Sequence, residues 1–141
     1  MKDFTLNNGI KLPAMGIGTY KAGLEGIITS IEAGCRYFDT ASYYGTEKLI
    51  AEAISKTGIP RKEFTIASKL WKTDMGFVNT LLAIERTLNN LETDYVDIYF
   101  IHWPNPELNA ETWEALEELC YQGKIRALGL SNFLPYHAEE I

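Results

Sequence analysis

Four side chains that could carry out proton chemistry are spread through the sequence: Asp39, Tyr44, Lys69 and His102. Asp39, Lys69 and His102 each follow a largely apolar run, in "RYFD", "FTIASK" and "IYFIH". A lysine after such a run is expected to bury its stem, and a buried ammonium is unfavourable unless an opposite charge lies beside it. We expect Asp39 to be the partner of Lys69.

A phenol beside an ammonium is suited to proton donation. Tyrosine is a poor acid at neutral pH because the reference pKa of a phenol is about 10, and a nearby positive charge favours the phenolate. We expect Lys69 to act on Tyr44 in this way, and a neutral His102 to donate a hydrogen bond to a substrate oxygen. Taken singly, each residue has an ordinary structural explanation, such as a turn cap for Asp39. The hypothesis therefore depends on all four occurring together.

Short apolar runs alternate with helical faces along the whole chain. A hairpin is expected at residues 4–13, turning at Asn8-Gly9, and strands are expected at 15–20, 35–40, 64–71, 95–103 and 124–133. Helical spacing of apolar residues predicts helices around 24–31, 49–54, 77–88 and 113–120. Such alternation is typical of parallel strands joined by right-handed crossovers.

Two folds have this alternation, an open doubly wound sheet and a (β/α)8 TIM barrel. Polar or reactive residues stand at the end of every expected strand, with Thr19 and Tyr20 at the end of the first strand and Ser131 and Asn132 at the end of the last. In a barrel, all strand ends converge on one active-site face, whereas an open sheet concentrates its ligands at one switch point. The pattern favours the barrel. The rings of Tyr20, Trp71 and Trp103 lie next to strand ends and are expected to wall a substrate pocket.

Composition narrows the classes of function. The 141 residues suit one domain, and 13 basic against 19 acidic residues give a net charge of −6, which disfavours a nucleic-acid binder. The same balance is unfavourable for a phosphate-bearing cofactor. No apolar run is long enough to span a membrane, the N-terminal residues lack the apolar core of a secretion signal, and two cysteines make no disulfide framework. We expect a cytoplasmic protein without a metal site.

Five motifs in a fixed order resemble the signature of the aldo-keto reductases: "GIGTY", "FDTASYYGTE", "IASKLW", "IYFIHWP" and "KIRALGLSNF". The resemblance runs from residue 4 to the last residue. It implies a (β/α)8 barrel that reduces aldehydes and ketones with NADPH. Matched position by position, it implies that Asp39, Tyr44, Lys69 and His102 are catalytic, with Tyr44 protonating the carbonyl oxygen as hydride leaves the nicotinamide. Tyr43 then becomes a wall residue.

The resemblance also implies positions that contact the cofactor. Ser131 and Asn132 match residues that hydrogen-bond the nicotinamide carboxamide, and the remaining contacts are Gly18, Thr19, Tyr20 and Asp39. A barrel of this type needs about 250 residues. We therefore expect residues 1–141 to form a single domain, the N-terminal part of a barrel truncated after its fifth strand. The loop that grips the adenosine phosphate would be absent, so cofactor affinity is expected to be weak, and NADH is not excluded.

Three arrangements of such a chain are open at this point. It can be a fragment of a reductase, a half-barrel that self-associates to cover its open edge, or an open sheet with helices on both faces. The leading function is reduction of a small carbonyl substrate, with no nucleic acid or membrane as partner. The alternative is a catalytically impaired half-barrel that acts as a binding or assembly module.

Overall fold

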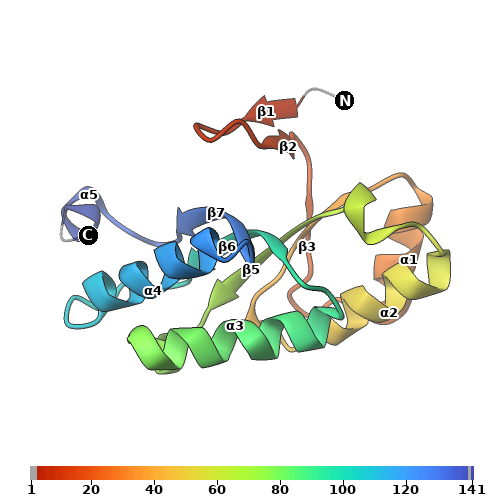
Figure 1. Cartoon of the computed structure of the whole chain (residues 1–141). Helices are drawn as coiled ribbons and strands as arrows, with labels where there is room; N and C mark the ends of the chain where they lie inside the picture. Colours follow the sequence, from red (N-terminus) through yellow and green to blue (C-terminus); the bar gives the residue numbers. More distant parts are fainter. Residues whose placement is uncertain (1–2, 140) are drawn as a thin grey trace.

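A computed structural model of the chain describes residues 3–139 and 141. Its centre is a sheet of five parallel strands in the order β3-β4-β5-β6-β7, so neighbours in the sheet are also neighbours in the sequence (Figure 1). The strands are β3 (Ile17–Gly18), β4 (Tyr37–Asp39), β5 (Thr65–Leu70), β6 (Val96–Ile101) and β7 (Ile125–Leu130). All five expected strands are confirmed.

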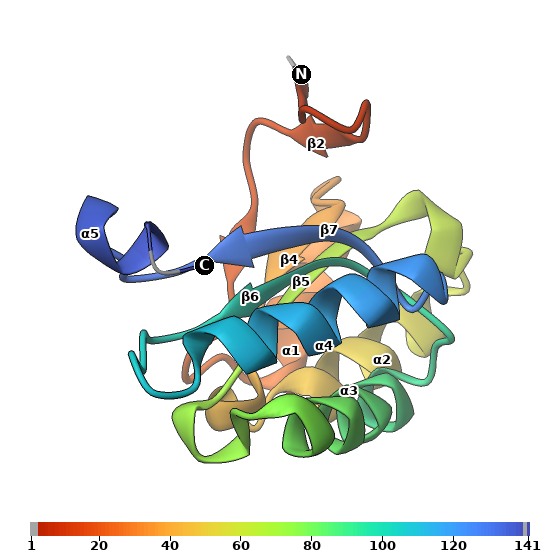
Figure 2. The same cartoon turned by 60° about the vertical axis from the view of Figure 1, so that its left-hand side comes forward.

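Four helices connect consecutive strands and pack on one face of the sheet (Figure 2). They are α1 (Leu24–Glu32), α2 (Glu47–Thr57), α3 (Phe77–Leu91) and α4 (Asn109–Tyr121), and the short α5 (Pro135–Ala138) follows β7. Sequential strand order with the helices on a single face is the arrangement of a (β/α) barrel, here represented by its first five units. The alternative of an open sheet with helices on both faces is therefore wrong for the described chain.

The N-terminal hairpin covers part of the opposite, concave face. β1 (Asp3–Thr5) pairs antiparallel with β2 (Lys11–Pro13), and Gly9 takes the positive φ of 85° that the expected turn requires. Apolar residues of this segment pack on the concave side of β5, β6 and β7: Leu6, Ile10 and Leu12 against Ala67, Ile98 and Ala127. The hairpin segment therefore covers these residues on the concave side of the partial barrel.

The main core lies between the sheet and the helices. Along β6, Tyr99 and Ile101 face the helices, whereas Ile98 faces the hairpin, as expected from the alternation of side chains in a strand. Both faces of β6 are therefore covered, which explains why "VDIYFI" is almost wholly apolar. Each large side chain buried in this way stabilises the fold by about 1.5–3 kcal/mol.

Three short 3₁₀ turns complete the loops: η1 (Ser42–Tyr44), η2 (Arg61–Glu63) and η3 (Lys72–Asp74). Of these, η1 and η3 follow the C-terminal ends of β4 and β5, where the candidate site residues lie. Within the part of the chain that the structure describes, no helix combines the length and the apolar character needed to cross a membrane.

Candidate active site

The candidate residues gather at one rim of the sheet, formed by the C-terminal ends of the parallel strands. Asp39 ends β4, Lys69 lies one residue before the end of β5, and His102 directly follows β6. Gly18 stands opposite Asp39 in the register between β3 and β4, and Ser131 follows β7. A parallel sheet brings these ends to the same side, so residues spread over more than one hundred positions meet in space.

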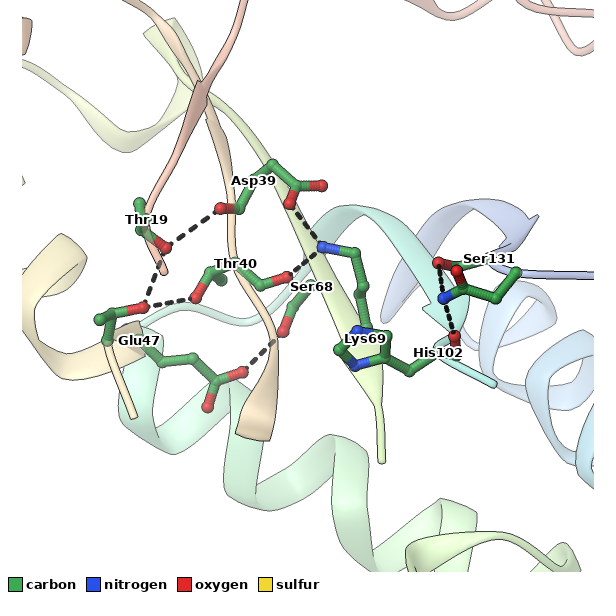
Figure 3. Close-up of polar contacts among 10 residues, drawn as sticks. Thr19, Asp39, Thr40, Glu47, Ser68, Lys69, His102 and Ser131 are labelled. Carbon is green, nitrogen blue, oxygen red and sulfur yellow. Dashed lines mark hydrogen bonds and ion pairs between the residues drawn. The ribbon is translucent and has the colours of Figure 1, made fainter. Parts of the chain in front are cut away.

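Lys69 and Asp39 form the centre of this rim (Figure 3). The Nζ atom of Lys69 lies 2.5 Å from Oδ1 of Asp39 and donates a second hydrogen bond, of 2.8 Å, to the carbonyl oxygen of Thr40. Lys69 is only 7% exposed. The ammonium of Lys69 thus has a carboxylate and a carbonyl oxygen as acceptors, and the pairing expected from the sequence is confirmed.

Tyr44 is held against this pair by η1. The centre of its ring lies 5.1 Å from Nζ of Lys69, within the range of a cation–π contact. The turn itself is tied to β5, because the hydroxyl of Ser42 donates a 3.1 Å hydrogen bond to the carbonyl oxygen of Lys69. Gly45 ends the turn at a φ of 69°, a conformation that favours glycine. The local sequence "SYYG" therefore places a phenol beside an ammonium.

His102 also lies beside Tyr44, with the two ring centres 5.6 Å apart in an edge-on arrangement. The residue is 7% exposed, and its Nδ1 is buried without a hydrogen-bond partner among the described residues. Burial lowers the pKa of His102 below its ordinary value, and the ammonium of Lys69 lowers it further, against an opposing effect of Asp39. The imidazole is therefore neutral at neutral pH and can donate a hydrogen bond.

Aromatic rings enclose Tyr44 and His102. Tyr20 lies 5.1 Å from the ring of Tyr44, and Trp71 lies 5.2 Å from the ring of His102. Tyr43 stacks on Trp71 at 4.0 Å, and Trp103 lies 6.4 Å from His102. Tyr20 and Trp103 are about half exposed, at 57% and 46%, so these rings form the open rim of the site. Flat apolar faces of this kind exclude water and accept planar groups.

Ser131 and Asn132, the two residues after β7, lie next to His102. Asn132 adopts a left-handed φ of 60°, which asparagine tolerates, and its side-chain amide donates hydrogen bonds to the carbonyl oxygen of His102, at 2.8 Å, and to the hydroxyl of Ser131, at 3.1 Å. The backbone N–H of Ser131 donates to Ile101. Ser131 and Asn132 are therefore part of the same rim as the four central residues.

Thr19 differs from the other positions of the rim because it is fully buried. Its hydroxyl donates to the carbonyl oxygen of Asp39 at 3.0 Å and lies 2.9 Å from the hydroxyl of Thr46. The side chain of Thr19 thus supports the rim from behind, while Gly18 and Tyr20 on either side are open to solvent.

Sequence reasoning missed a buried polar group directly behind Lys69. The carboxylate of Glu47, 3% exposed, accepts hydrogen bonds from the hydroxyl of Ser68 at 2.7 Å and from the side chain of Asn90 at 2.9 Å. One signal was present: Ser68 precedes Lys69 in a strand and must face the helices, where a hydroxyl needs a partner. No pattern in the sequence identifies Glu47 as that partner.

Comparison with known proteins agrees with this geometry. A profile described as the Aldo/keto reductase family matches residues 20–141. The glyoxal reductase of Bacillus subtilis is 41% identical over 141 residues, covering 96% of this chain and 51% of that protein. A 9,11-endoperoxide prostaglandin H2 reductase of Trypanosoma cruzi is 40% identical over 142 residues, covering 97% of this chain and 50% of that protein. The chain thus spans about half the length of the curated relatives it matches.

Solved structures show the same relation. The aldo/keto reductase of Brucella melitensis superposes with a TM-score of 0.93 at 36% sequence identity, over 98% of this chain and 56% of that one. An aldo-keto reductase from a deep-sea metagenome library superposes with a TM-score of 0.94 at 37% identity, over 99% of this chain and 52% of that one. Sequence, fold and the arrangement of the rim agree, and the chain belongs to the aldo/keto reductase family.

Proposed function

We propose that this chain contributes the proton-donating side of the active site of an oxidoreductase that reduces aldehydes and ketones to alcohols. The observation that supports this most strongly is the position of the Tyr44 ring, 5.1 Å from the ammonium of Lys69, which pairs with the carboxylate of Asp39. Relatives named as reductases, among them a glyoxal reductase, support the same reaction class. The substrate would be a small carbonyl compound.

In this mechanism Tyr44 is the general acid that donates its proton to the carbonyl oxygen. Lys69 stabilises the phenolate left behind, and Asp39 holds the lysine in place. The neutral imidazole of His102 donates a hydrogen bond that orients the carbonyl group. Tyr20, Trp71 and Trp103 form the walls that exclude water. One hydride and this proton together convert the carbonyl group into an alcohol.

The hydride would come from a nicotinamide cofactor, for which we propose NADPH on the family resemblance. The rim fits the nicotinamide end of such a molecule because it combines flat aromatic faces with a buried polar atom that lacks a partner, Nδ1 of His102. The residues that would hold it are Gly18, Tyr20, Asp39, Ser131 and Asn132, with Thr19 supporting them from behind. When bound, the cofactor supplies the hydride.

Activity is tested by following the loss of NADPH absorbance with a reactive aromatic aldehyde. Tyr44→Phe keeps the ring and removes the proton, so we expect turnover to fall by a factor of about 100 or more. Tyr43→Phe is the matched control because it alters the neighbouring wall residue, and its turnover should stay within about threefold of the unaltered chain. Equal effects of the two substitutions would contradict the assignment of Tyr44 as the acid.

We further propose that the chain binds the cofactor weakly. A net charge of −6 repels a phosphate-bearing ligand. Trp71 and Trp103 lie at the rim, so quenching of tryptophan fluorescence reports cofactor binding. We expect a Kd well above about 1 µM, and a tighter value would refute weak binding.

The second candidate function is that of an assembly module. β3 and β7 lie at the two ends of the sheet order, so each presents an edge to a further strand. We propose that a second copy of the chain covers these edges. A module of this kind would keep its self-association in Tyr44→Phe, whereas an enzyme would lose its turnover.

A further inference from the structure

Three buried threonine hydroxyls form a connected group behind Asp39 and Lys69. Thr19 follows β3, Thr40 follows β4, and Thr46 directly precedes α2. Thr19 and Thr40 are fully buried and Thr46 is 4% exposed. The Oγ1 atom of Thr46 lies 2.9 Å from Oγ1 of Thr19 and 2.9 Å from Oγ1 of Thr40, so Thr46 is the central member.

The number of available protons determines the direction of every hydrogen bond in this group. Each hydroxyl has one proton, and a carbonyl oxygen only accepts. The hydroxyl of Thr19 donates to the carbonyl oxygen of Asp39 at 3.0 Å, so Thr46 must donate to Thr19. The single proton of Thr46 is then used, so Thr40 must donate to Thr46. The bonds therefore run one way, from Thr40 through Thr46 and Thr19 to Asp39.

We call this series of hydrogen bonds, from Thr40 through Thr46 and Thr19 to Asp39, the relay. It begins and ends on adjacent residues at the end of β4. Thr40 starts it with its hydroxyl, and its carbonyl oxygen accepts the 2.8 Å hydrogen bond from Lys69. Asp39 ends it with its carbonyl oxygen, and its carboxylate pairs with the same lysine. The two residues that hold the ammonium of Lys69 are therefore both fixed by hydrogen bonds that pass through Thr46.

Thr46 takes part in the relay and does not cap α2 with its hydroxyl. It occupies the N-cap of α2, where a threonine hydroxyl normally accepts a hydrogen bond from a backbone N–H of the first turn. Here Thr46 makes no such bond, and its backbone is helical, with φ of −103° and ψ of −1°, in place of the extended conformation typical of a cap. Its hydroxyl is turned toward the strand ends instead.

We propose that Thr46 is a positioning residue for Lys69, acting through the relay that it completes. Without the Thr46 hydroxyl, the proton of Thr40 has no acceptor and Oγ1 of Thr19 has no donor. Buried groups left unpaired are unfavourable, so the ends of β3 and β4 shift and the acceptors of Lys69 move. The effect on catalysis rests on the proposed function, whereas the effect on the strand ends does not.

The test uses the full chain with three substitutions. Thr46→Val keeps the shape and removes the hydroxyl, and Thr46→Ser restores the hydroxyl. Thr87→Val is the matched control, because Thr87 is 1% exposed and its hydroxyl lies 3.4 Å from that of Tyr99, outside the group of three threonines. Amide hydrogen exchange is measured at Thr19, whose N–H donates to the carbonyl oxygen of Asp39 at 2.9 Å.

We expect exchange at Thr19 to accelerate about tenfold in Thr46→Val and to return to within about threefold in Thr46→Ser. Exchange there should not change in Thr87→Val. If the chain turns over, kcat should fall about tenfold in Thr46→Val with KM within about threefold, and serine should restore it. Loss of kcat without loss of binding distinguishes positioning from a general effect on folding.

The outcomes separate this proposal from the proposed function. Exchange that responds as expected in a chain without turnover supports the relay and contradicts the catalytic role. If the amide exchange rate at Thr19 is the same in Thr46→Val as in Thr87→Val, the relay is overturned. If an active chain keeps its kcat in Thr46→Val, the proposal that Thr46 positions Lys69 is overturned.

If Thr46→Val does not fold, the direction of the relay still provides a test. Thr19→Val removes two hydrogen bonds and Thr40→Val removes one, so Thr19→Val should lower the urea midpoint further. The reverse order would overturn the relay.

Discussion

Asp39 and Lys69 form an ion pair in which the two partners differ in burial, because the side chain of Asp39 is 35% exposed and that of Lys69 is 9% exposed. Asp39→Asn leaves the ammonium with one carbonyl and a neutral amide. Removing one partner of a fully buried pair costs about 3–5 kcal/mol, but water screens this carboxylate. We expect the free energy of unfolding in urea to fall by about 1–2 kcal/mol.

The control for this substitution is Glu52→Gln, which breaks an exposed i,i+4 pair with Lys56 of 3.0 Å. Surface pairs of this kind contribute about 0.5 kcal/mol or less. Equal losses for Asp39→Asn and Glu52→Gln would show that the pair at the rim has no special role in stability.

His102 makes stability depend on pH. Its pKa lies below the ordinary value of about 6.5, chiefly because of burial and then because of the Lys69 ammonium. The unfolded chain therefore takes up a proton at a higher pH than the folded chain. The contribution of the neutral His102 side chain to the free energy of unfolding is fully present above about pH 6.5. It is lost as the pH falls from there through the pKa that His102 has in the folded chain.

The corresponding measurement is urea unfolding at several pH values between about 5 and 7.5, a range in which most carboxylates stay ionised. The free energy of unfolding should decrease toward the acid end, and His102→Gln should reduce this slope. A slope that is identical in His102→Gln would exclude His102 as its source.

At the level of elements, two aromatic rings lie directly over glycines, one just before β3 and one within β7. A Cβ atom at Gly129 in β7 would lie 2.3 Å from the ring of Phe100, and one at Gly16 would lie 2.5 Å from the ring of Tyr37. Gly129→Ala must displace Phe100 from the concave face. Such overpacking costs about 1–3 kcal/mol, which thermal or urea unfolding would detect.

Gly26 is the matched control, because a Cβ atom there meets nothing within 4 Å and the residue lies in α1. Alanine is a better helix former than glycine, so Gly26→Ala should stabilise the chain by about 0.5–1 kcal/mol. The two glycine-to-alanine substitutions therefore have opposite predicted signs. Stabilisation by Gly129→Ala would mean that the Phe100 ring does not occupy the space above β7.

For the whole molecule, the edges of β3 and β7 lead to a prediction about assembly. Unpaired strand edges favour association with further strands, and the proposed occupant is a second copy of the chain. Sedimentation velocity at protein concentrations from about 1 to 100 µM should show a dimer that grows with concentration, as mass action requires. A monomer over the whole range would contradict self-association.

Much of the architecture was predictable from local patterns. The hairpin at Asn8-Gly9, the alternation of strands and helices and the strand-end positions of Asp39, Lys69 and His102 all follow from periodicity and turn chemistry, which involve residues close in sequence. The pairing of Lys69 with Asp39 was also predictable, because a buried ammonium needs an opposite charge and few candidates lie at the same rim.

Other features were decided only by the tertiary structure. Periodicity does not show on which side of the sheet each helix lies, so the polar strand ends favoured a barrel but only the packing of the helices on one face excludes an open sheet with helices on both faces. The partners of Thr46 and Glu47 also had to be found in space, since Thr19 is 27 residues from Thr46 and Asn90 is 43 residues from Glu47. A buried hydroxyl or carboxylate requires a partner, but packing alone determines which residue provides it.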